Sequence, residues 1–459
     1  MTKPRVLFPL LFVALLAARL CHTGILWAEE TLPLAAAQQM RFGRTLYRDI
    51  WFDKPPLLVL AHLPLAPGWT LRVAAALYCL LACWIIYRFA RDLWSEREAA
   101  IAAALLAFFL IFAIPSAVTP LASDMLMLAP HIVAVWMASG AGPRPAPYRA
   151  LLAGLFAGVA VWISPKGLLV LAACAVWNPA PLLFAGFAAA AAPGALIVPP
   201  GYWSQVWIWG RLYASAGFSL SNAITRTLNW CGFHLACAPA LIARESRSLR
   251  WILWLAISFA GVAAGFRFFP RYYLQLLPVV VLLASRAYTQ IPRARWAALL
   301  LLIPLIRFAP TYYYALHPGA WRDTAMDQDS RATAALLRRL TQPGDKLFVW
   351  GYRPEIYVYS GLPAASRFLD SQPLSGVPAD RHLTESAPVE TEASAAHRRE
   401  LTTTNPTLIV DGLGLYNAKL ALSAFPDLSA WMNSYREVAR TPHTVIYVLL
   451  PHPAGPPLP

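Results

Sequence analysis

Residues 27–57 read WAEETLPLAAAQQMRFGRTLYRDIWFDKPPL, a charged segment between two apolar regions of the chain. Its ionisable side chains include Glu29, Glu30, Arg41, Arg44, Arg48, Asp53 and Lys54. Ionisable groups are costly to keep at a membrane, and when present there they commonly mark a functional site. The segment therefore predicts a site next to the first membrane crossing.

The composition predicts a polytopic helical membrane protein. Of the 459 residues, 58% are hydrophobic and 13% are charged, whereas a soluble domain carries about 25% charged residues. Apolar runs near the ~20 residues that span a bilayer recur through residues 1–310. The net charge of +15 is explained by arginines in cytoplasmic loops, which set topology. No compact basic region favours a nucleic-acid partner.

The spacing of the apolar runs predicts about eleven crossings. Basic residues mark every second connection, beginning with Lys3 and Arg5 and continuing with Arg88 and Arg144. This alternation places the N-terminus in the cytoplasm and the C-terminal tail outside. The expected centres of the crossings lie near residues 14, 80, 106, 132, 156, 172, 190, 237, 258, 280 and 303.

The tail differs in character from the rest of the chain. Residues 326–342 are predicted to form an amphipathic helix, residues 345–351, 407–413 and 443–450 are predicted strands, and the polar segment 371–400 is expected to be a mobile loop. We therefore predict a transmembrane domain at 1–311, with loop 27–57 at its outer face. A small α/β domain at 312–459 would face the outside.

In this topology the outer connections carry a second set of charges that topology does not explain. They include Asp124, Lys166, Arg211, Arg226, Arg267 and Arg271. Converging Arg and Lys side chains suit a phosphate group, and carboxylates among them suit a general base or metal coordination. Simpler roles stay open: Asp124 as a helix cap, Asp53 and Lys54 as a local ion pair, and the aromatics of these loops, Tyr213 among them, as an interfacial belt.

Within the opening segment a short helix is expected along the membrane surface. Thr31 is expected to cap it, with Pro33 in the first turn. Because neighbouring helix residues point about 100° apart, Glu29 and Glu30 cannot share one role. One of them is expected to face a cavity and the other to lie near the positive end of the helix. The alternative is that both only cap the helix.

Three motifs together resemble those of the C-type membrane glycosyltransferases, and most closely the protein O-mannosyltransferases and the aminoarabinose transferases of lipid A. They are the acidic pair Glu29 and Glu30 ahead of YRDIWFDKPPL, RFFPRYYLQLLP at residues 267–278, and VWGYRPEIYVYSG at residues 349–361. The resemblance covers most of the chain. Where relatives often read FPHYYLQ, this chain has Arg271 in place of the histidine, which keeps a phosphate ligand but removes a group that titrates near neutrality.

The resemblance implies transfer of a sugar from a polyprenyl-phosphate donor to a lipid, glycan or protein acceptor, outside a bacterial cytoplasmic membrane. Its acidic positions fall on Glu29, Glu30 and Asp124 as catalytic residues. Lys54 matches the lysine before the double proline. Together with the outer charges, this gives the expected substrate-binding residues Lys54, Lys166, Arg267, Arg271, Tyr272 and Tyr273.

The expected reaction inverts the anomeric centre, with Glu29 or Glu30 as the general base. Some related enzymes use a divalent metal ion, but too few ligands are evident for the sequence to assign one. Two rival functions use the same charges: a transporter or flippase of a lipid-linked sugar, and a non-catalytic membrane assembly protein. A single outer cavity that contains both acids and cations favours the enzyme.

Overall fold

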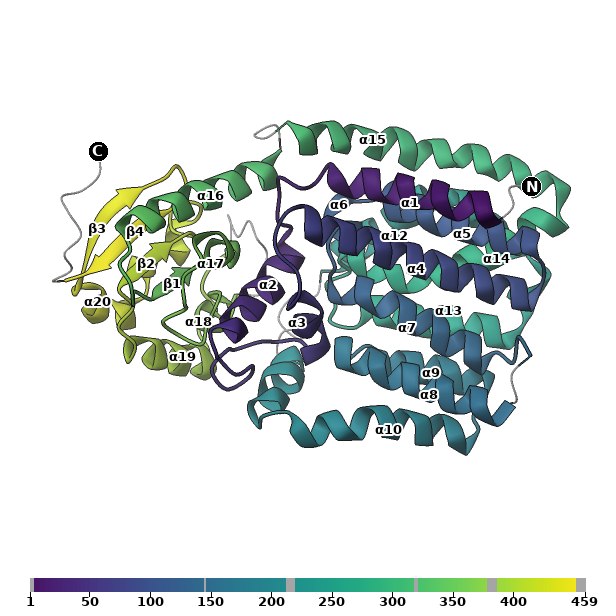
Figure 1. Cartoon of the computed structure of the whole chain (residues 1–459), viewed down its shortest axis with the longest axis horizontal. Helices are drawn as coiled ribbons and strands as arrows, with labels where there is room; N and C mark the ends of the chain where they lie inside the picture. Colours follow the sequence, from purple (N-terminus) through teal and green to yellow (C-terminus); the bar gives the residue numbers. More distant parts are fainter. Residues whose placement is uncertain (1–3, 144–145, 212–218, 318–320, 378–385, 451–459) are drawn as a thin grey trace.

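The computed structural model of the chain describes residues 4–143, 146–211, 219–317, 321–377 and 386–450. Lys3, Arg144 and Tyr213 lie outside these ranges. Figure 1 shows two parts along the long axis, a group of helices and a smaller part that contains a sheet. The helices α2 (Ala28–Arg41) and α3 (Pro56–His62) lie between the two parts.

The larger part consists of apolar helices that run roughly alongside one another (Figure 1). They are α1 (Pro4–Leu20), α4 (Trp69–Leu93), α5 (Glu96–Ile111), α6 (Pro115–Val118), α7 (Ser123–Ala138), α8 (Ala146–Ile163), α9 (Gly167–Trp177), α10 (Pro181–Ile197), α12 (Leu220–Phe233), α13 (Leu249–Ala263), α14 (Leu277–Gln290) and α15 (Leu302–Leu316). Short 3-10 or π segments lie at Trp203–Ile208, Leu235–Ile242, Arg244–Arg247, Pro270–Leu276 and Pro292–Leu301.

Each expected crossing centre falls inside one of these helices, except residue 237, which lies in the 3-10 segment after α12. Among the described residues, three helical segments are long and apolar enough to cross a membrane by length and composition: Trp69–Leu93, Ala146–Ile163 and Pro292–Leu316. Several others, such as α7 and α13, are apolar but shorter. The count of eleven crossings stays a prediction. Helix α15 continues to Leu316, five residues past the expected domain boundary at 311.

The smaller part contains a four-stranded sheet in the order β1-β2-β4-β3. Strands β1 (Leu347–Trp350) and β2 (Leu408–Asp411) pair in parallel, and both are buried along their whole length. Continuous apolar runs such as LFVW are typical of strands covered on both faces. Strands β4 (Val445–Leu449) and β3 (Tyr435–Arg440) add antiparallel pairs. All three predicted strands are confirmed, and β3 was not predicted.

Helix α16 (Arg322–Leu340) contains the predicted amphipathic segment. The prediction of a loop at 371–400 is wrong where α18 (Gln372–Ser375) and α19 (Glu392–Thr402) form. That prediction rested on the polarity of the segment alone. The Thr391 side chain accepts the backbone N–H of Ser394 and so caps α19, which is a local signal of a helix start. The remaining helices of this part are α17 (Glu355–Ser360) and α20 (Pro426–Met432), with 3-10 turns at Ala418–Leu420 and Leu422–Ala424.

The charged loop 27–57 joins the two parts. Gln39 exchanges hydrogen bonds with the backbone of Leu362 and Ala364, at 3.2 and 2.7 Å. The Trp51 backbone N–H donates to the Arg367 carbonyl at 2.8 Å, and the Trp51 ring packs into the apolar core of the sheet part. The loop is therefore held against the sheet part by hydrogen bonds and by apolar packing.

Candidate active site

A pocket of about 600 Å³ lies where α2, the end of loop 27–57, the start of α7 and the sheet part meet. It contains two carboxylates and two cations, Glu29, Asp53, Lys54 and Arg271. The other lining residues are Ala28, Leu32, Pro33, Phe52, Leu58, Ser123, Tyr352 and Gln372. A pocket that holds both acids and cations is the arrangement expected to favour an enzyme over the rival functions.

Arg271 brings two of the predicted acids together. Its Nη1 pairs with Glu29 Oε1, and its Nε lies 3.8 Å from Asp124 Oδ2. On the other side of Asp124, the Lys166 Nζ donates to Oδ1 at 3.0 Å. The same ammonium lies 3.2 Å from the centroid of the Tyr272 ring, a cation–π contact. The sequence-distant residues Glu29, Asp124, Lys166, Arg271 and Tyr272 thus form one connected cluster.

Asp124 does not cap its helix. The N-cap of α7 is Ala122, and no side chain caps it. The Asp124 side chain is 2% exposed and engages cations instead. A buried carboxylate is tolerated when it is paired and hydrogen-bonded, and Lys166 and Arg271 meet that need.

The two glutamates have different environments. Glu29 lines the pocket, whereas Glu30 is fully buried in a bidentate ion pair with Arg72, with N–O distances of 2.5 and 3.0 Å. Glu30 also accepts the Trp27 backbone N–H at 2.9 Å. Helix α2 begins at Ala28, so the expected Thr31 cap is wrong: the Thr31 hydroxyl donates to the Ala28 carbonyl inside the first turn. The helix starts earlier because the Glu30 carboxylate accepts the backbone N–H of Trp27, the residue at its N-cap.

Arg72 holds more than Glu30. Its Nε donates to the His22 carbonyl at 3.0 Å, and its Nη2 donates to the Ile25 carbonyl at 2.7 Å. Both carbonyls belong to the chain that leads into α2. Arg72 therefore fixes the segment that places Glu29 at the pocket.

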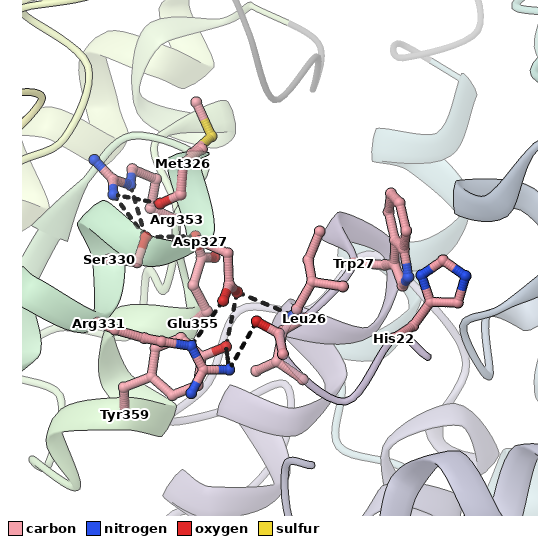
Figure 2. A network of polar contacts seen from close by, with 12 residues as sticks. His22, Leu26, Trp27, Met326, Asp327, Ser330, Arg331, Arg353, Glu355 and Tyr359 are labelled. Carbon is pink, nitrogen blue, oxygen red and sulfur yellow. Dashed lines mark hydrogen bonds and ion pairs between the residues drawn. The ribbon is translucent and has the colours of Figure 1, made fainter. Parts of the chain in front are cut away.

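A second group of side chains, from the C-terminal part of the protein, holds the same segment that leads into α2. Figure 2 shows Asp327 of α16 between the Leu26 backbone and the side chains of Arg331 and Tyr359. Asp327 accepts the Leu26 N–H at 2.9 Å, the Tyr359 hydroxyl at 2.7 Å and the Arg331 Nε at 2.8 Å. The start of α2 is thus clamped between α4 and α16.

The Asp327→Ala variant should lose about 1–3 kcal/mol of stability, because the Leu26 N–H and the Arg331 guanidinium lose a buried charged partner. Tyr359→Phe leaves the Asp327 carboxylate in place but removes two hydrogen bonds of the same group, one to Asp327 and one from Arg331 Nη2, each worth about 0.5–1.5 kcal/mol. Thermal unfolding of the purified variants measures both. Equal stability of Asp327→Ala and the parent would contradict this account of the clamp.

The wall of the pocket formed by the sheet part carries polar groups that the sequence did not indicate. Burial, together with the nearby Glu29, Asp370 and Asp53 carboxylates, raises the pKa of the Tyr352 hydroxyl well above its usual value. Burial raises the pKa of Asp370 to about 7, and Asp53 adds to this effect. Asp370 therefore gains or loses a proton near neutral pH.

This shift predicts a pH-dependent stability. The folded-state pKa of Asp370 lies above the unfolded value, so the folded protein holds the proton more tightly and its stability falls as the pH rises from about 4 to about 7. Asp370→Asn removes this loss. The melting temperature of the variant minus that of the parent should be larger at pH 8 than at pH 5. A difference that does not change with pH would contradict the prediction.

The other predicted residues lie in different places. Lys54 pairs with Asp53 at 2.5 Å and also lines the pocket, so the ion pair and the site coincide. Tyr273 is buried away from the charged pocket, where its hydroxyl bonds Thr227 at 2.7 Å. Arg267 is not a lining residue of the charged pocket, and its carbonyl accepts from Arg226 at 2.7 Å.

The arginines of the opening segment have structural roles. Arg41 donates to the carbonyls of Leu63 and Leu65. Arg44 donates to the carbonyls of Ala364 and Ser366 at 3.1 and 2.8 Å. Arg48 pairs with its neighbour Asp49 at the surface. None of the three lines the charged pocket.

Four residues of the site were missed by the sequence analysis: Arg72, Tyr352, Asp370 and Gln372. Arg72 left a usable signal, because an arginine inside the apolar run of α4 requires a buried partner. Tyr352 lies within the quoted motif VWGYRPEIYVYSG. Asp370 and Gln372 border or fall in the segment mistaken for a loop, and no local pattern marks them.

Within the described ranges, no group of three or more His, Cys, Asp or Glu side chains is placed to hold a metal ion. Glu29 and Asp124, the candidate ligands, both engage Arg271. The residues present therefore do not fit a metal site, and no step below is assigned to one.

Comparison with known proteins gives one family match and several structural relatives. Residues 59–203 match the family model of the dolichyl-phosphate-mannose-protein mannosyltransferases. No curated protein sequence matches the chain significantly. ArnT from Cupriavidus metallidurans, solved with undecaprenyl phosphate bound, superposes with a TM-score of 0.64 at 17% identity, over 98% of this chain and 99% of that one.

The oligosaccharyltransferase AglB of Archaeoglobus fulgidus shares the fold, with a lower TM-score. Its complex with an inhibitory peptide and a dolichol-phosphate gives a TM-score of 0.51 at 12% identity, covering 95% of this chain and 74% of that one. A complex of the same archaeal enzyme with zinc and sulfate gives 0.52 at 12% identity, covering 96% and 73%. The resemblance inferred from the sequence motifs is thereby confirmed: the chain has the fold of the C-type membrane glycosyltransferases, and residues 59–203 match the mannosyltransferase family model.

Proposed function

We propose that the protein is a membrane glycosyltransferase that moves a sugar from a polyprenyl-phosphate donor to a hydroxyl of an acceptor, at the pocket lined by Glu29 and Arg271. The observation that carries the proposal is the convergence of acids and cations from distant segments on one pocket. The family match and the fold support it, and the structural relatives were solved with undecaprenyl phosphate or a dolichol-phosphate.

In this proposal Arg271 binds the donor phosphate. Its guanidinium offers a bidentate fork that matches a phosphate, and Lys54 adds a point charge in the same pocket. Both cations would stabilise the charge that grows on the phosphate as the glycosidic bond breaks, which is usually the largest catalytic contribution. Phosphate binding to Arg271 competes with the Glu29 pair and so releases the Glu29 carboxylate.

Glu29 is the general base of the proposal, because it lines the pocket while Glu30 is held by Arg72. It removes the proton from the acceptor hydroxyl as the oxygen attacks the anomeric carbon, and the polyprenyl phosphate leaves from the opposite side. A single attack of this kind inverts the anomeric configuration. Asp124 and Lys166 hold Arg271 and Tyr272 in place from behind the pocket.

Two apolar cavities suit the polyprenyl chain. One of about 590 Å³ is lined by Pro270, the residue before Arg271, together with Phe109, Trp230 and Tyr273. A second of about 1530 Å³ shares Trp230 and Tyr273 and is lined otherwise mostly by aliphatic and aromatic side chains. An apolar path that begins beside the proposed phosphate site is what a lipid-linked donor requires.

We also propose that the charged pocket lies on the outer face of a bacterial cytoplasmic membrane. Residues 1–311 would be embedded in the membrane and residues 312–459 would lie outside it. The positive-inside pattern of the connections supports this orientation. Accessibility of single introduced cysteines to an impermeant thiol reagent, in the sheet part and in the loop at Arg244–Arg247, tests it directly.

The Arg271→Lys variant should bind undecaprenyl phosphate about tenfold or more weakly, because lysine lacks the bidentate fork. Arg267→Lys is the matched comparison, since Arg267 lies on the same loop but does not line the charged pocket. Titration of detergent-purified protein with the lipid measures both affinities. Unchanged binding in Arg271→Lys would place the phosphate elsewhere, and a loss confined to Arg267→Lys would move the phosphate toward that side chain.

Reconstitution in liposomes separates the enzyme from the flippase. An enzyme consumes the lipid-linked sugar and leaves the bare polyprenyl phosphate, whereas a flippase moves the intact lipid between leaflets. We expect consumption in the presence of acceptor. Movement of intact donor with no bare lipid phosphate formed would overturn the proposed function.

A further inference from the structure

Gln372, the first residue of α18, lines the charged pocket, and Asp370 lies next to it, accepting its backbone N–H. Their side chains are almost fully buried, with 1% and 4% of each residue exposed. Gln372 lines the pocket together with Tyr352 and Asp53. Neither residue has a role in the base or phosphate chemistry proposed above.

Both residues carry an oxygen that lacks a hydrogen-bond partner among the described residues. Asp370 Oδ1 accepts the Gln372 backbone N–H at 2.8 Å, but Asp370 Oδ2 has no partner there, nor has Gln372 Oε1. Leaving a buried polar atom unsatisfied costs about 1–3 kcal/mol, and most buried polar atoms in folded proteins are paired. Two such atoms, one on a pocket-lining residue and one on the residue hydrogen-bonded to it, indicate a ligand that pairs with them.

The chemistry of the two atoms limits the ligand. Gln372 Oε1 can only accept a hydrogen bond, so the ligand must donate to it. The Asp370 carboxyl is near its pKa at neutral pH, because burial and Asp53 favour the protonated form. It can therefore donate as well as accept. Hydroxyl groups match this behaviour, since each one donates one hydrogen bond and accepts others.

Asp370 and Gln372 lie near the residues to which the reaction is assigned. The Tyr352 hydroxyl experiences the charges of Glu29, Asp370, Asp53 and Arg271. It is therefore near the proposed base and phosphate ligand as well as Asp370, and Gln372 lines the same pocket as Glu29 and Arg271.

We propose that Asp370 and Gln372 form a hydroxyl-binding subsite of the pocket, which holds ring hydroxyls of the transferred sugar or hydroxyls of the acceptor. The subsite rests on the proposed glycosyl transfer and specifies where that reaction recognises its substrate. It assigns recognition to the sheet part and chemistry to loop 27–57 and Arg271. Both residues select the substrate and neither takes part in breaking the glycosidic bond.

The test uses Asp370→Asn and Gln372→Met in the full-length protein. Asparagine keeps the acceptor for the Gln372 N–H and replaces the second oxygen by an amide, and methionine keeps the length of Gln372 without its polar atoms. Asp411→Asn is the matched control: it is also a buried aspartate of the sheet part, whose carboxylate accepts the N–H groups of Leu413, Gly414 and Leu422 away from the pocket. Thermal unfolding confirms that each variant is folded.

Two probes separate the sources of the hydroxyl groups. Affinity is measured for bare undecaprenyl phosphate and for the undecaprenyl-phosphate pentose or hexose that the parent consumes, and the KM for acceptor is measured with that donor. A loss of about tenfold or more in affinity for the sugar-bearing lipid alone assigns the subsite to the sugar. A similar rise in the acceptor KM alone assigns it to the acceptor.

Parent-like affinity for both lipids and a parent-like acceptor KM in Asp370→Asn and Gln372→Met would overturn the subsite while leaving the proposed function intact. An equal loss for bare and sugar-bearing lipid would also overturn it, because that result places the two residues at the phosphate. If the parent consumes no sugar-bearing lipid of the series, the proposed function fails and the subsite fails with it.

Discussion

The Glu29→Gln variant is expected to lose about 10²-fold or more in kcat, because glutamine cannot accept the proton of the attacking hydroxyl. Its affinity for undecaprenyl phosphate should equal or exceed that of the parent, since the variant removes the carboxylate that pairs with Arg271. Steady-state turnover and lipid titration measure the two quantities. This separation of rate from binding is the signature of a group that acts in the transition state.

Glu30→Gln provides the matched comparison on the same helix turn. Glu30 lies in the Arg72 ion pair and does not line the pocket, so this variant should lose stability and retain kcat in the fraction that remains folded. Full turnover in Glu29→Gln together with a 10²-fold loss in folded Glu30→Gln would exchange the two assignments.

The second large effect is expected for Arg72→Met. The Arg72 and Glu30 side chains are 1% and 0% exposed, and removing one partner of a buried pair costs about 3–5 kcal/mol because the other charge stays buried without compensation. The loss of the His22 and Ile25 carbonyl contacts adds to it. Thermal unfolding in detergent, followed by tryptophan fluorescence, measures the change.

Two further variants make this result specific. Arg72→Met combined with Glu30→Met should recover a large part of the stability, because the uncompensated charge is gone. Arg91→Met removes an arginine of the same helix whose partner, Asp92, lies 3.8 Å away near the surface, and it should cost at most about 1 kcal/mol. A double variant as unstable as Arg72→Met alone would mean that the carbonyl contacts, and not the ion pair, dominate.

The parts of the molecule that could be predicted are those in which local pattern decides structure. LFVW and the LIV of β2 are continuous apolar runs, and they form the parallel pair of the sheet. Small or apolar residues at helical spacing, such as Met326, Thr333 and Leu337, give α16 one buried face. Strand β3 escaped prediction because YREVAR lacks the alternation of polar and apolar residues that marks a strand, and its pairing shifts register between Glu437 and Ala439.

The division of labour between Glu29 and Glu30 could not be predicted, because it depends on a partner far along the chain. Sequence reasoning separates their directions but cannot show that Arg72 lies beside one of them. The same applies to Asp370 and Gln372, whose place in the pocket is set by how the sheet part packs on loop 27–57. Long-range packing therefore decides the roles of these side chains, whereas local propensity decides which segments form helices and strands.

The central claim is tested most directly by incubating the purified protein with a series of undecaprenyl-phosphate pentoses and hexoses in the presence of acceptor. Mass spectrometry of the lipid then follows the conversion of sugar-bearing donor to bare undecaprenyl phosphate. We expect the parent to convert at least one donor. For the same donor, the rate of Glu29→Gln should be lower by a factor of about 10² or more. No conversion of any donor, or equal conversion by parent and Glu29→Gln, would contradict the central claim.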